Sequence, residues 1–311
     1  MTTPLRIGTR ASTLALWQAN WVKAELEREW PGLQIDLVPI KTTGDKILNV
    51  PLAEVGGKGL FTKEIDDALL DGRVDIAVHS MKDIPYQLPQ GIEFGAIPQR
   101  EDPRDALVSN GRTLDDLPPA ARIGTSSLRR QVQLRYRLRS VRITTLRGNV
   151  DTRLRKLAAG EFDAIILALA GLKRLGHESV VTQILEESFM LPAIGQGALA
   201  ITCRAGDKKT LSHIAVLNHA PSQLAVTAER GLLAAVEGSC KIPIAGHAQL
   251  VDGVITLKGL VANLSGTSVV TGEISGEPGK ARELGITLGK EILDRGGREI
   301  LAEISQHGTD R

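Results

Sequence analysis

The chain has 311 residues, of which 42% are hydrophobic and 24% charged, and its formal net charge is +2. This length corresponds to about two or three domains, and the composition excludes disordered and collagen-like proteins. With only four Phe, three Trp and two Tyr, a surface that stacks single-stranded nucleic acid on a row of rings is disfavoured. No apolar run approaches the ~20 residues of a membrane span and no targeting signal opens the chain, so we expect a cytoplasmic protein.

The first part of the chain alternates between strand and helix patterns. In order, the sequence predicts a strand at residues 6–9, a helix with Leu14, Trp17, Trp21 and Ala24 on one face, a strand at 33–40, a helix at 58–70 and a strand at 74–79. Such βαβ units imply a mostly parallel sheet covered by helices, with ligands bound beyond the carboxyl ends of the strands. The segment HSMKD, residues 79–83, lies at such an end.

Two stretches of the first part recur later in the same order. Residues 6–9 (RIGT) return as residues 122–125, and the helix end and strand at residues 70–78 resemble those at 158–166. This pattern predicts two domains of related topology. The stretch LPAIGQGA, residues 191–198, is punctuated by Pro and Gly and predicts a crossover or hinge after the second domain.

The last part of the chain follows a different pattern. It predicts a helix at residues 223–236, short strands at 245–250, 254–261 and 268–276 joined by Asp-Gly and Ser-Gly turns, and a helix at 280–294. This order is typical of a small α+β domain with an antiparallel sheet.

Basic residues concentrate in one stretch of the predicted second domain. Residues 122–156 hold ten arginines and one lysine against a single acid, Asp151, so the rest of the chain carries a net charge of −8. A solvated basic face is the simplest explanation. However, residues 125–127 and 147–149 form two strand-to-helix turns, where free backbone N–H groups attract anions and arginines follow at once. The placement favours a polyanionic ligand.

Nucleic acid and small polyanions are the two classes of ligand to weigh. Duplex nucleic acid would bind such a stretch through counterion release, but the rest of the chain is acidic and no nucleic-acid-binding motif occurs. A small polycarboxylate or polyphosphate in a cleft fits better, because the arginine fork binds either group through two parallel hydrogen bonds.

Few reactive groups remain once the common catalytic motifs are excluded. The chain lacks the phosphate loop GxxxxGK[ST] and the GxSxG, HExxH and GxGxxG patterns. Lys82 and Asp83 place a cation and a carboxylate at the end of a buried strand, where a developing positive charge or an N–H group could be stabilised; a loop salt bridge is the alternative. His79 on the same strand is expected to be buried and hydrogen-bonded.

The two cysteines, Cys203 and Cys240, belong to no CxxC motif and no Cys/His cluster, which predicts free thiols and neither a disulfide scaffold nor a zinc site. Cys240 lies in a loop beside Lys241, which makes it a candidate for covalent attachment of a ligand. Cys203, between apolar residues and Arg204, is expected to be buried in a strand.

Nine sequence blocks together resemble the porphobilinogen deaminase (hydroxymethylbilane synthase) family. They are LRIGTRAS, VGGKGLFTKE, DIAVHSMKDIP, REDPRDA, IGTSSLRRQ, LRGNVDTRL, AGLKRLG, LPAIGQGAL and EGSCKIPI, and they occur in the family's order over nearly the whole chain. The resemblance implies an α/β protein of three domains. Two related domains like those of periplasmic binding proteins, residues 1–98 with 198–218 and residues 103–192, enclose an active-site cleft. A small α+β domain with a three-stranded antiparallel sheet, residues 221–311, carries a cofactor loop.

The resemblance also implies a reaction. Four porphobilinogen molecules are deaminated and joined head to tail on a dipyrromethane cofactor, which Cys240 holds through a thioether, and hydroxymethylbilane and ammonia are released. Asp83 stands at the family's catalytic position, where a carboxylate would stabilise the cation formed as ammonia leaves. Each pyrrole carries an acetate and a propionate, so about twelve negative charges accumulate on six rings, which gives the arginine excess a purpose.

The family's binding residues can be carried over position by position. The cofactor contacts implied are Lys82, Ser127, Arg129, Arg130 and Gly148, and the substrate contacts are Arg10, Ser12, Arg147, Arg153, Lys58 and Arg174. Glu54 and Lys241 depart from the residues that the family often has. We expect a monomer that takes porphobilinogen as its partner and needs no nucleic acid, membrane or metal. A non-catalytic binding protein for a small polyanion is the alternative that the duplicated architecture alone permits.

Overall fold

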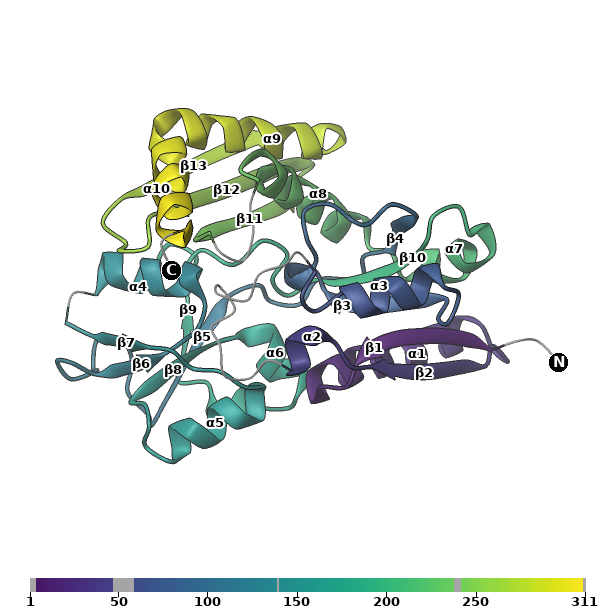
Figure 1. Ribbon diagram of the computed structural model, residues 1–311, viewed down its shortest axis with the longest axis horizontal. Helices are drawn as coiled ribbons and strands as arrows, with labels where there is room; N and C mark the ends of the chain where they lie inside the picture. Colours follow the sequence, from purple (N-terminus) through teal and green to yellow (C-terminus); the bar gives the residue numbers. More distant parts are fainter. Residues whose placement is uncertain (1–3, 47–58, 139, 238–241, 310–311) are drawn as a thin grey trace.

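The computed structural model of the protein describes residues 4–46, 59–138, 140–237 and 242–309 (Figure 1). These residues form two five-stranded sheets and one three-stranded sheet, each with helices packed against it. The predicted fold class, α/β with two related units and a small α+β unit, is confirmed. Within the described ranges, no helix is both long and apolar enough to cross a bilayer.

The first unit is built around the sheet β2-β1-β3-β10-β4. Its elements are β1 (Leu5–Arg10), α1 (Thr13–Glu29), β2 (Ile35–Ile40), α2 (Thr43–Lys46), α3 (Lys63–Leu70), β3 (Ile76–Ser80), a 3₁₀ turn (Met81–Asp83), β4 (Ile92–Ala96), β10 (Leu199–Arg204), α7 (Lys208–Ile214) and a 3₁₀ turn (Ala215–Leu217). Strand β1 is parallel to β2 and β3, as predicted. The prediction of a mostly parallel sheet is confirmed, since β4 also runs in this direction; within this sheet β10 is the exception, antiparallel to both β3 and β4. Strand β10 enters the sheet beside the carboxyl end of β3, since Leu199 pairs with Ser80, and therefore runs against it.

Two predicted helices of this unit differ from the observed ones. Helix α1 buries Gln18, Ala19, Val22 and Leu26, whereas Trp17 of the predicted face is 37% exposed. Helix α3 begins at Lys63 and not at residue 58, because Gly59 adopts a φ of +76° and residues 59–62 form a turn closed by hydrogen bonds to its carbonyl oxygen.

The second unit repeats the strand order of the first. Its elements are β5 (Asp105–Ser109), β6 (Arg122–Gly124), α4 (Leu128–Arg137), β7 (Arg142–Thr144), α5 (Val150–Ala158), β8 (Ala164–Ala168), α6 (Leu169–Arg174), a 3₁₀ turn (Glu178–Val180) and β9 (Gln183–Leu185). The sheet order is β7-β6-β8-β5-β9, with β6 parallel to β7 and β8, and β5 antiparallel to β8 and β9. Strands β1 and β6, which begin the two sequence repeats, occupy equivalent places. The predicted duplication is confirmed.

The third unit is the small α+β unit that the sequence predicts. It comprises α8 (Ala220–Ala235), β11 (Ile244–Val251), β12 (Val254–Ala262), β13 (Val269–Gly276), a 3₁₀ turn (Pro278–Lys280), α9 (Ala281–Ile292), a kinked turn (Leu293–Gly297) and α10 (Arg298–Thr309). The sheet is antiparallel throughout, and Leu232 and Leu288 belong to the apolar core between it and the helices. The sequence did not predict α10, which follows a break at Gly296, where φ is +110°.

Two chain segments connect the first two units, residues 97–104 and the predicted crossover, residues 191–198. They pass so close that a Cβ on Gly197 would lie 2.3 Å from the carbonyl oxygen of Glu101. Helix α8 supports both segments through Glu229, which is fully buried. Its carboxylate forms an ion pair with Arg100 and accepts a hydrogen bond from the backbone N–H of Gly195. All three units therefore meet at these connections.

Candidate active site

The segment Met81–Asp83 continues directly from the carboxyl end of β3. Met81 and Ile84 are buried, and the backbone N–H of Met81 donates to the carbonyl oxygen of Ala198 at 3.0 Å. The two polar side chains between them, Lys82 and Asp83, are thus carried on a short turn that is anchored at both ends. This placement agrees with the rule that ligands bind beyond the carboxyl ends of the strands.

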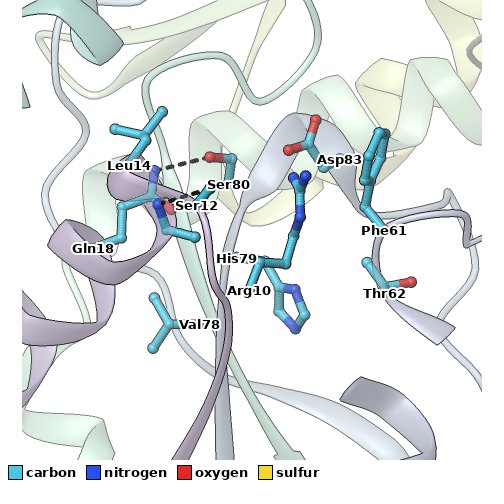
Figure 2. Close-up of a pocket in the computed structure, with 11 residues that line it drawn as sticks. Arg10, Ser12, Leu14, Gln18, Phe61, Thr62, Val78, His79, Ser80 and Asp83 are labelled. Atoms are coloured by element: carbon cyan, nitrogen blue, oxygen red, sulfur yellow. Dashed lines mark hydrogen bonds between the residues drawn. The ribbon is translucent and has the colours of Figure 1, made fainter. Parts of the chain in front are cut away.

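A pocket at the end of β1 and β3 brings together Arg10, Ser12 and Asp83, three of the predicted site residues (Figure 2). Ser12 is the N-cap of α1, and its hydroxyl accepts a hydrogen bond from the backbone N–H of Ala15. The N-terminus of this helix, which favours negative charge, therefore opens at the pocket.

Arg10 is held in the pocket by two contacts. Its guanidinium group forms an ion pair with Asp45, with an Nη2–Oδ1 distance of 2.5 Å, and lies over the ring of Phe61 at 4.3 Å. Thr42 donates to the other carboxylate oxygen of Asp45 and fixes its orientation. Figure 2 shows the guanidinium group of Arg10 directed toward the end of the pocket at which the carboxylate of Asp83 lies.

Two polar residues of the pocket lie on buried positions. His79 is 6% exposed, and burial, followed by the positive charge of Arg10, lowers its pKa to about 4. The imidazole is therefore neutral at neutral pH, and the prediction that it is buried is confirmed. Gln18, which the sequence analysis missed, donates to the hydroxyl of Ser80 at 2.9 Å. A single polar residue on the buried face of α1 was the available signal for it.

Arg129 and Arg130 share one buried carboxylate, Asp105. Arg129 Nη1 donates to Oδ2 at 2.7 Å, and Arg130 donates to Oδ1 from Nη2 at 2.7 Å and from Nε at 3.1 Å. Burial alone would raise the pKa of Asp105, but the two guanidinium groups outweigh it and hold that pKa well below its usual range. Gln196 of the crossover donates to the same carboxylate at 2.9 Å. The sequence analysis missed Asp105, since nothing near it in sequence marks its partners.

A second arginine pair lies at the turn before α5. Gly148 has a φ of +115°, and a Cβ there would lie 2.6 Å from the side chain of Thr152, so the turn requires glycine. Its carbonyl oxygen accepts a hydrogen bond from Nε of Arg153 at 2.8 Å. Burial, then Arg130, then Arg147 lower the pKa of Arg153 to about 10. Nη1 of Arg147 is buried and has no hydrogen-bond partner among the described residues.

The remaining predicted contacts, Lys82, Arg174 and Ser127, lie on the turn after β3, at the end of α6 and at the start of α4. Lys82 lies on the exposed side of the turn after β3, and desolvation, followed by the positive charge of Arg130, lowers the pKa of its ammonium group to about 8. Arg174 donates to the carbonyl oxygen of Gly197 at 2.7 Å, and burial lowers its pKa to about 10. Ser127 is the N-cap of α4, where its hydroxyl accepts from the backbone N–H of Arg130.

Two predicted site residues, Cys240 and Lys58, lie outside the described residues, as do the family departures Glu54 and Lys241. Cys203 is fully buried in β10, as predicted, and burial raises its pKa to about 11. In the part of the chain that the structure describes, no group of three or more His, Cys, Asp or Glu side chains could hold a metal ion.

The charges of this region suit an anionic ligand with several carboxylates. The positive charge of Arg130 acts on Lys82 of the first unit and on Arg153 of the second, so the two sets of cations influence each other electrostatically. Burial is the largest cause of both lowered pKa values, and the repulsion between neighbouring cations adds to it. Among the residues that the structure describes, Nη1 of Arg147 and the buried Nε of Arg129 have no hydrogen-bond partner and are free donors in the same region.

Comparisons with known proteins agree along the whole chain. A family model described as the dipyrromethane cofactor binding domain of porphobilinogen deaminase matches residues 5–212, and one described as its C-terminal domain matches residues 223–294. The porphobilinogen deaminase of Geobacter sulfurreducens is 54% identical over 99% of this chain and 96% of its own length. That of Syntrophobacter fumaroxidans is also 54% identical, over 96% of this chain and 97% of its own length.

The solved structures that resemble the chain are more distant. An ancestral cationic amino acid solute binding protein is 17% identical, with a TM-score of 0.44, and the match covers 69% of this chain and 87% of that one. The periplasmic VFT2 domain of BvgS from Bordetella pertussis is 12% identical, with a TM-score of 0.41, over 68% of this chain and 86% of that one.

Proposed function

The chain belongs to the porphobilinogen deaminase family, and we propose that Asp83 is the catalytic residue while arginines of both large units bind the acidic side chains of the pyrroles. The enzyme is a transferase of tetrapyrrole biosynthesis. It deaminates four porphobilinogen molecules, joins them head to tail on a dipyrromethane cofactor, and releases hydroxymethylbilane and ammonia. A non-catalytic polyanion-binding protein is not favoured.

The observation that carries the proposal is the place of Asp83 in the pocket with Arg10 and the neutral His79. A carboxylate there can accept hydrogen bonds from pyrrole N–H groups and stabilise the positive charge that develops as the amine leaves. Arg10, fixed by Asp45, would hold a substrate carboxylate close by. Since Asp83 lies on a turn anchored by buried residues, its carboxylate needs little reorganisation during each condensation.

The described residues fit the dipyrromethane cofactor. Its carboxylates suit the unpartnered donors Arg147 Nη1 and Arg129 Nε and the cations whose pKa values are lowered. We propose that Lys82, Ser127, Arg129, Arg130 and Gly148 hold it, and that Cys240 attaches it through a thioether. When bound, the cofactor supplies the pyrrole carbon to which the first substrate is joined.

The substrate side is assigned to the remaining cations. Arg10, Ser12, Arg147, Arg153, Lys58 and Arg174 would bind the acetate and propionate groups of incoming and growing pyrroles. Arginine suits this task because its planar fork binds a carboxylate through two hydrogen bonds. The pairing of Asp105 with Arg129 and Arg130 keeps these two side chains in place before any ligand arrives.

Four further proposals concern the whole chain. We propose domain limits of 1–98 with 198–218, 103–192 and 221–311, which the strands of the three sheets support, since β10 lies in the first sheet. We also propose a monomer that uses no metal and is located in the cytoplasm. Light scattering after gel filtration, elemental analysis and cell fractionation would test these three properties.

Replacement of Asp83 tests the catalytic proposal. We expect Asp83→Asn to lower turnover by at least about 10²-fold, since a carboxylate that stabilises developing charge is lost, while the thermal midpoint stays within a few degrees. Asp71→Asn, at a carboxylate that is 63% exposed on the far end of α3, is the matched control and should keep full turnover. Unchanged turnover in Asp83→Asn would reject the assignment.

Intact mass tests the cofactor proposal independently. After expression with substrate available, we expect the chain to exceed its sequence mass by one dipyrromethane, and Cys240→Ser to show the bare mass. A wild-type chain of bare mass would contradict the attachment.

A further inference from the structure

A side chain of the third unit holds the segment that carries the catalytic aspartate. Arg230 of α8 donates from Nη2 to the carbonyl oxygens of Pro85 at 2.8 Å and Tyr86 at 2.9 Å. Its Nη1 lies 3.9 Å from the sulfur of Met81, and its guanidinium group lies over the ring of Phe94 at 4.8 Å. These contacts fall at the first residue of the turn Met81–Asp83, called the catalytic turn below, and just after its end.

The partners of Arg230 are neutral, which is unusual for a half-buried arginine. Within residues 4–46, 59–138, 140–237 and 242–309, its hydrogen bonds go to carbonyl oxygens and a sulfur, and no carboxylate contributes to its pKa. Burial lowers its pKa to about 10, so its surroundings disfavour the charge. A planar fork is nonetheless the group that can donate to two successive carbonyl oxygens and stack on a ring at once.

The other contacts of the segment are apolar. Met81 and Ile84 pack with Val226 of α8 and Ala198 of the crossover in one small core. Apolar packing of this kind buries the turn but has no direction, whereas the hydrogen bonds of Arg230 fix the path of the backbone at residues 85–86. Asp83 lies two residues before the first of these carbonyl groups.

We propose that Arg230 is a positioning residue that sets the place of Asp83 relative to the third unit. This inference rests on the proposed catalytic role of Asp83. Helix α8 ends at Ala235, five residues before the proposed attachment point Cys240. One helix thus fixes the catalytic carboxylate and begins the segment that bears the cofactor, so that Arg230 couples the two groups whose relative position decides each condensation.

The test compares Arg230→Met and Arg230→Lys with a matched control. Met keeps the stem of the side chain but not its donors, and Lys restores a cation with fewer geometric constraints. The control is Arg135→Met, which removes another bond to the third unit, from α4 to the carbonyl oxygen of Leu264, without contact to the catalytic turn. For each variant we would measure kcat, KM, the holoenzyme fraction by intact mass, and the thermal midpoint.

We expect Arg230→Met to lower kcat per holoenzyme about 10- to 100-fold, the size of effect that a displacement of about 1 Å produces, with KM changed less than threefold. Arg230→Lys should recover part of kcat, and Arg135→Met should keep it. A normal kcat per holoenzyme in Arg230→Met, with only a lower thermal midpoint, would overturn the inference. Arg230 would then serve only to hold the third unit against the first. Asp83→Asn in the same assay separates the two proposals. If Asp83→Asn is fully active, the catalytic role of Asp83 fails. If Asp83→Asn is inactive while Arg230→Met keeps a normal kcat, the positioning role of Arg230 fails.

Discussion

The close approach of the two connecting segments gives a prediction about Gly197. This residue has a φ of +86°, in the left-handed region, and a Cβ on it would lie 2.3 Å from the carbonyl oxygen of Glu101. That oxygen belongs to the backbone and cannot rotate away as a flexible side chain could. Gly197→Ala therefore has to move one connecting segment away from the other.

Two destabilising effects add in Gly197→Ala, whereas only one acts at a matched glycine. A side chain in the left-handed conformation costs about 1–2 kcal/mol, and overpacking a tight site costs about 1–3 kcal/mol more. Gly206 has a φ of +78° but nothing within 4 Å of its Cβ position, so Gly206→Ala carries the first cost alone. We expect the free energy of unfolding to fall by about 2–5 kcal/mol for Gly197→Ala and about 1–2 kcal/mol for Gly206→Ala.

Thermal and urea unfolding of the two variants, both as holoenzymes, would measure this difference. Gly197→Ala should also lose turnover, because the carbonyl oxygen of Gly197 accepts a hydrogen bond from Arg174 and its displacement would disturb that side chain. Gly206→Ala should remain fully active. Equal unfolding free energies for the two variants would refute the claim that the close contact between the connecting segments dictates glycine.

Two further predictions concern buried charges. Asp105→Asn should destabilise the protein by about 3–5 kcal/mol in urea unfolding, because Arg129 and Arg130 would lose their shared counter-charge; a loss below about 1 kcal/mol would contradict the buried cluster. His79 has a pKa lowered from 6.5 to about 4, so the folded state binds fewer protons than the unfolded state between these values, and stability rises with pH there. We expect a contribution of about 3 kcal/mol to the free energy of unfolding that is fully present above pH ~6.5 and is lost progressively as the pH falls toward ~4. The His79→Asn variant should lack this pH dependence, and an unchanged pH dependence would contradict the lowered pKa of His79.

Local patterns in the sequence were sufficient for much of the fold. The two strand-turn-helix repeats and the antiparallel third unit were predicted because Gly turns and the alternation of apolar residues act within a few residues. The direction of β10 was not, since it depends on where the chain returns to the first sheet after about a hundred residues in the second. The end of α9 lies within two residues of its predicted end, but α10, which follows the break at Gly296, was missed.

The candidate site also contains residues that local sequence patterns predict and residues that they do not. Asp83, Arg10 and Ser12 meet in one pocket because each follows or ends a parallel strand, which is a local rule. Asp105 could not be predicted, because its partner Arg129 lies 24 residues away and Gln196 lies 91 residues away on the crossover. Burial of a carboxylate among such partners is decided by tertiary packing alone.

The balance of charge around Asp105 explains how a site rich in cations folds before its ligand is present. Two buried arginines without a counter-charge would be prohibitively costly, whereas two fully paired arginines would have little left to offer a ligand. One carboxylate between Arg129 and Arg130 is the intermediate case: it secures both side chains and leaves a net positive charge. After burial, that charge is the next cause of the lowered pKa values of Lys82 and Arg153. In the proposed binding mode, ligand carboxylates would meet cations that are already ordered and poorly neutralised. Binding would therefore cost little conformational entropy and would reduce the repulsion between these cations.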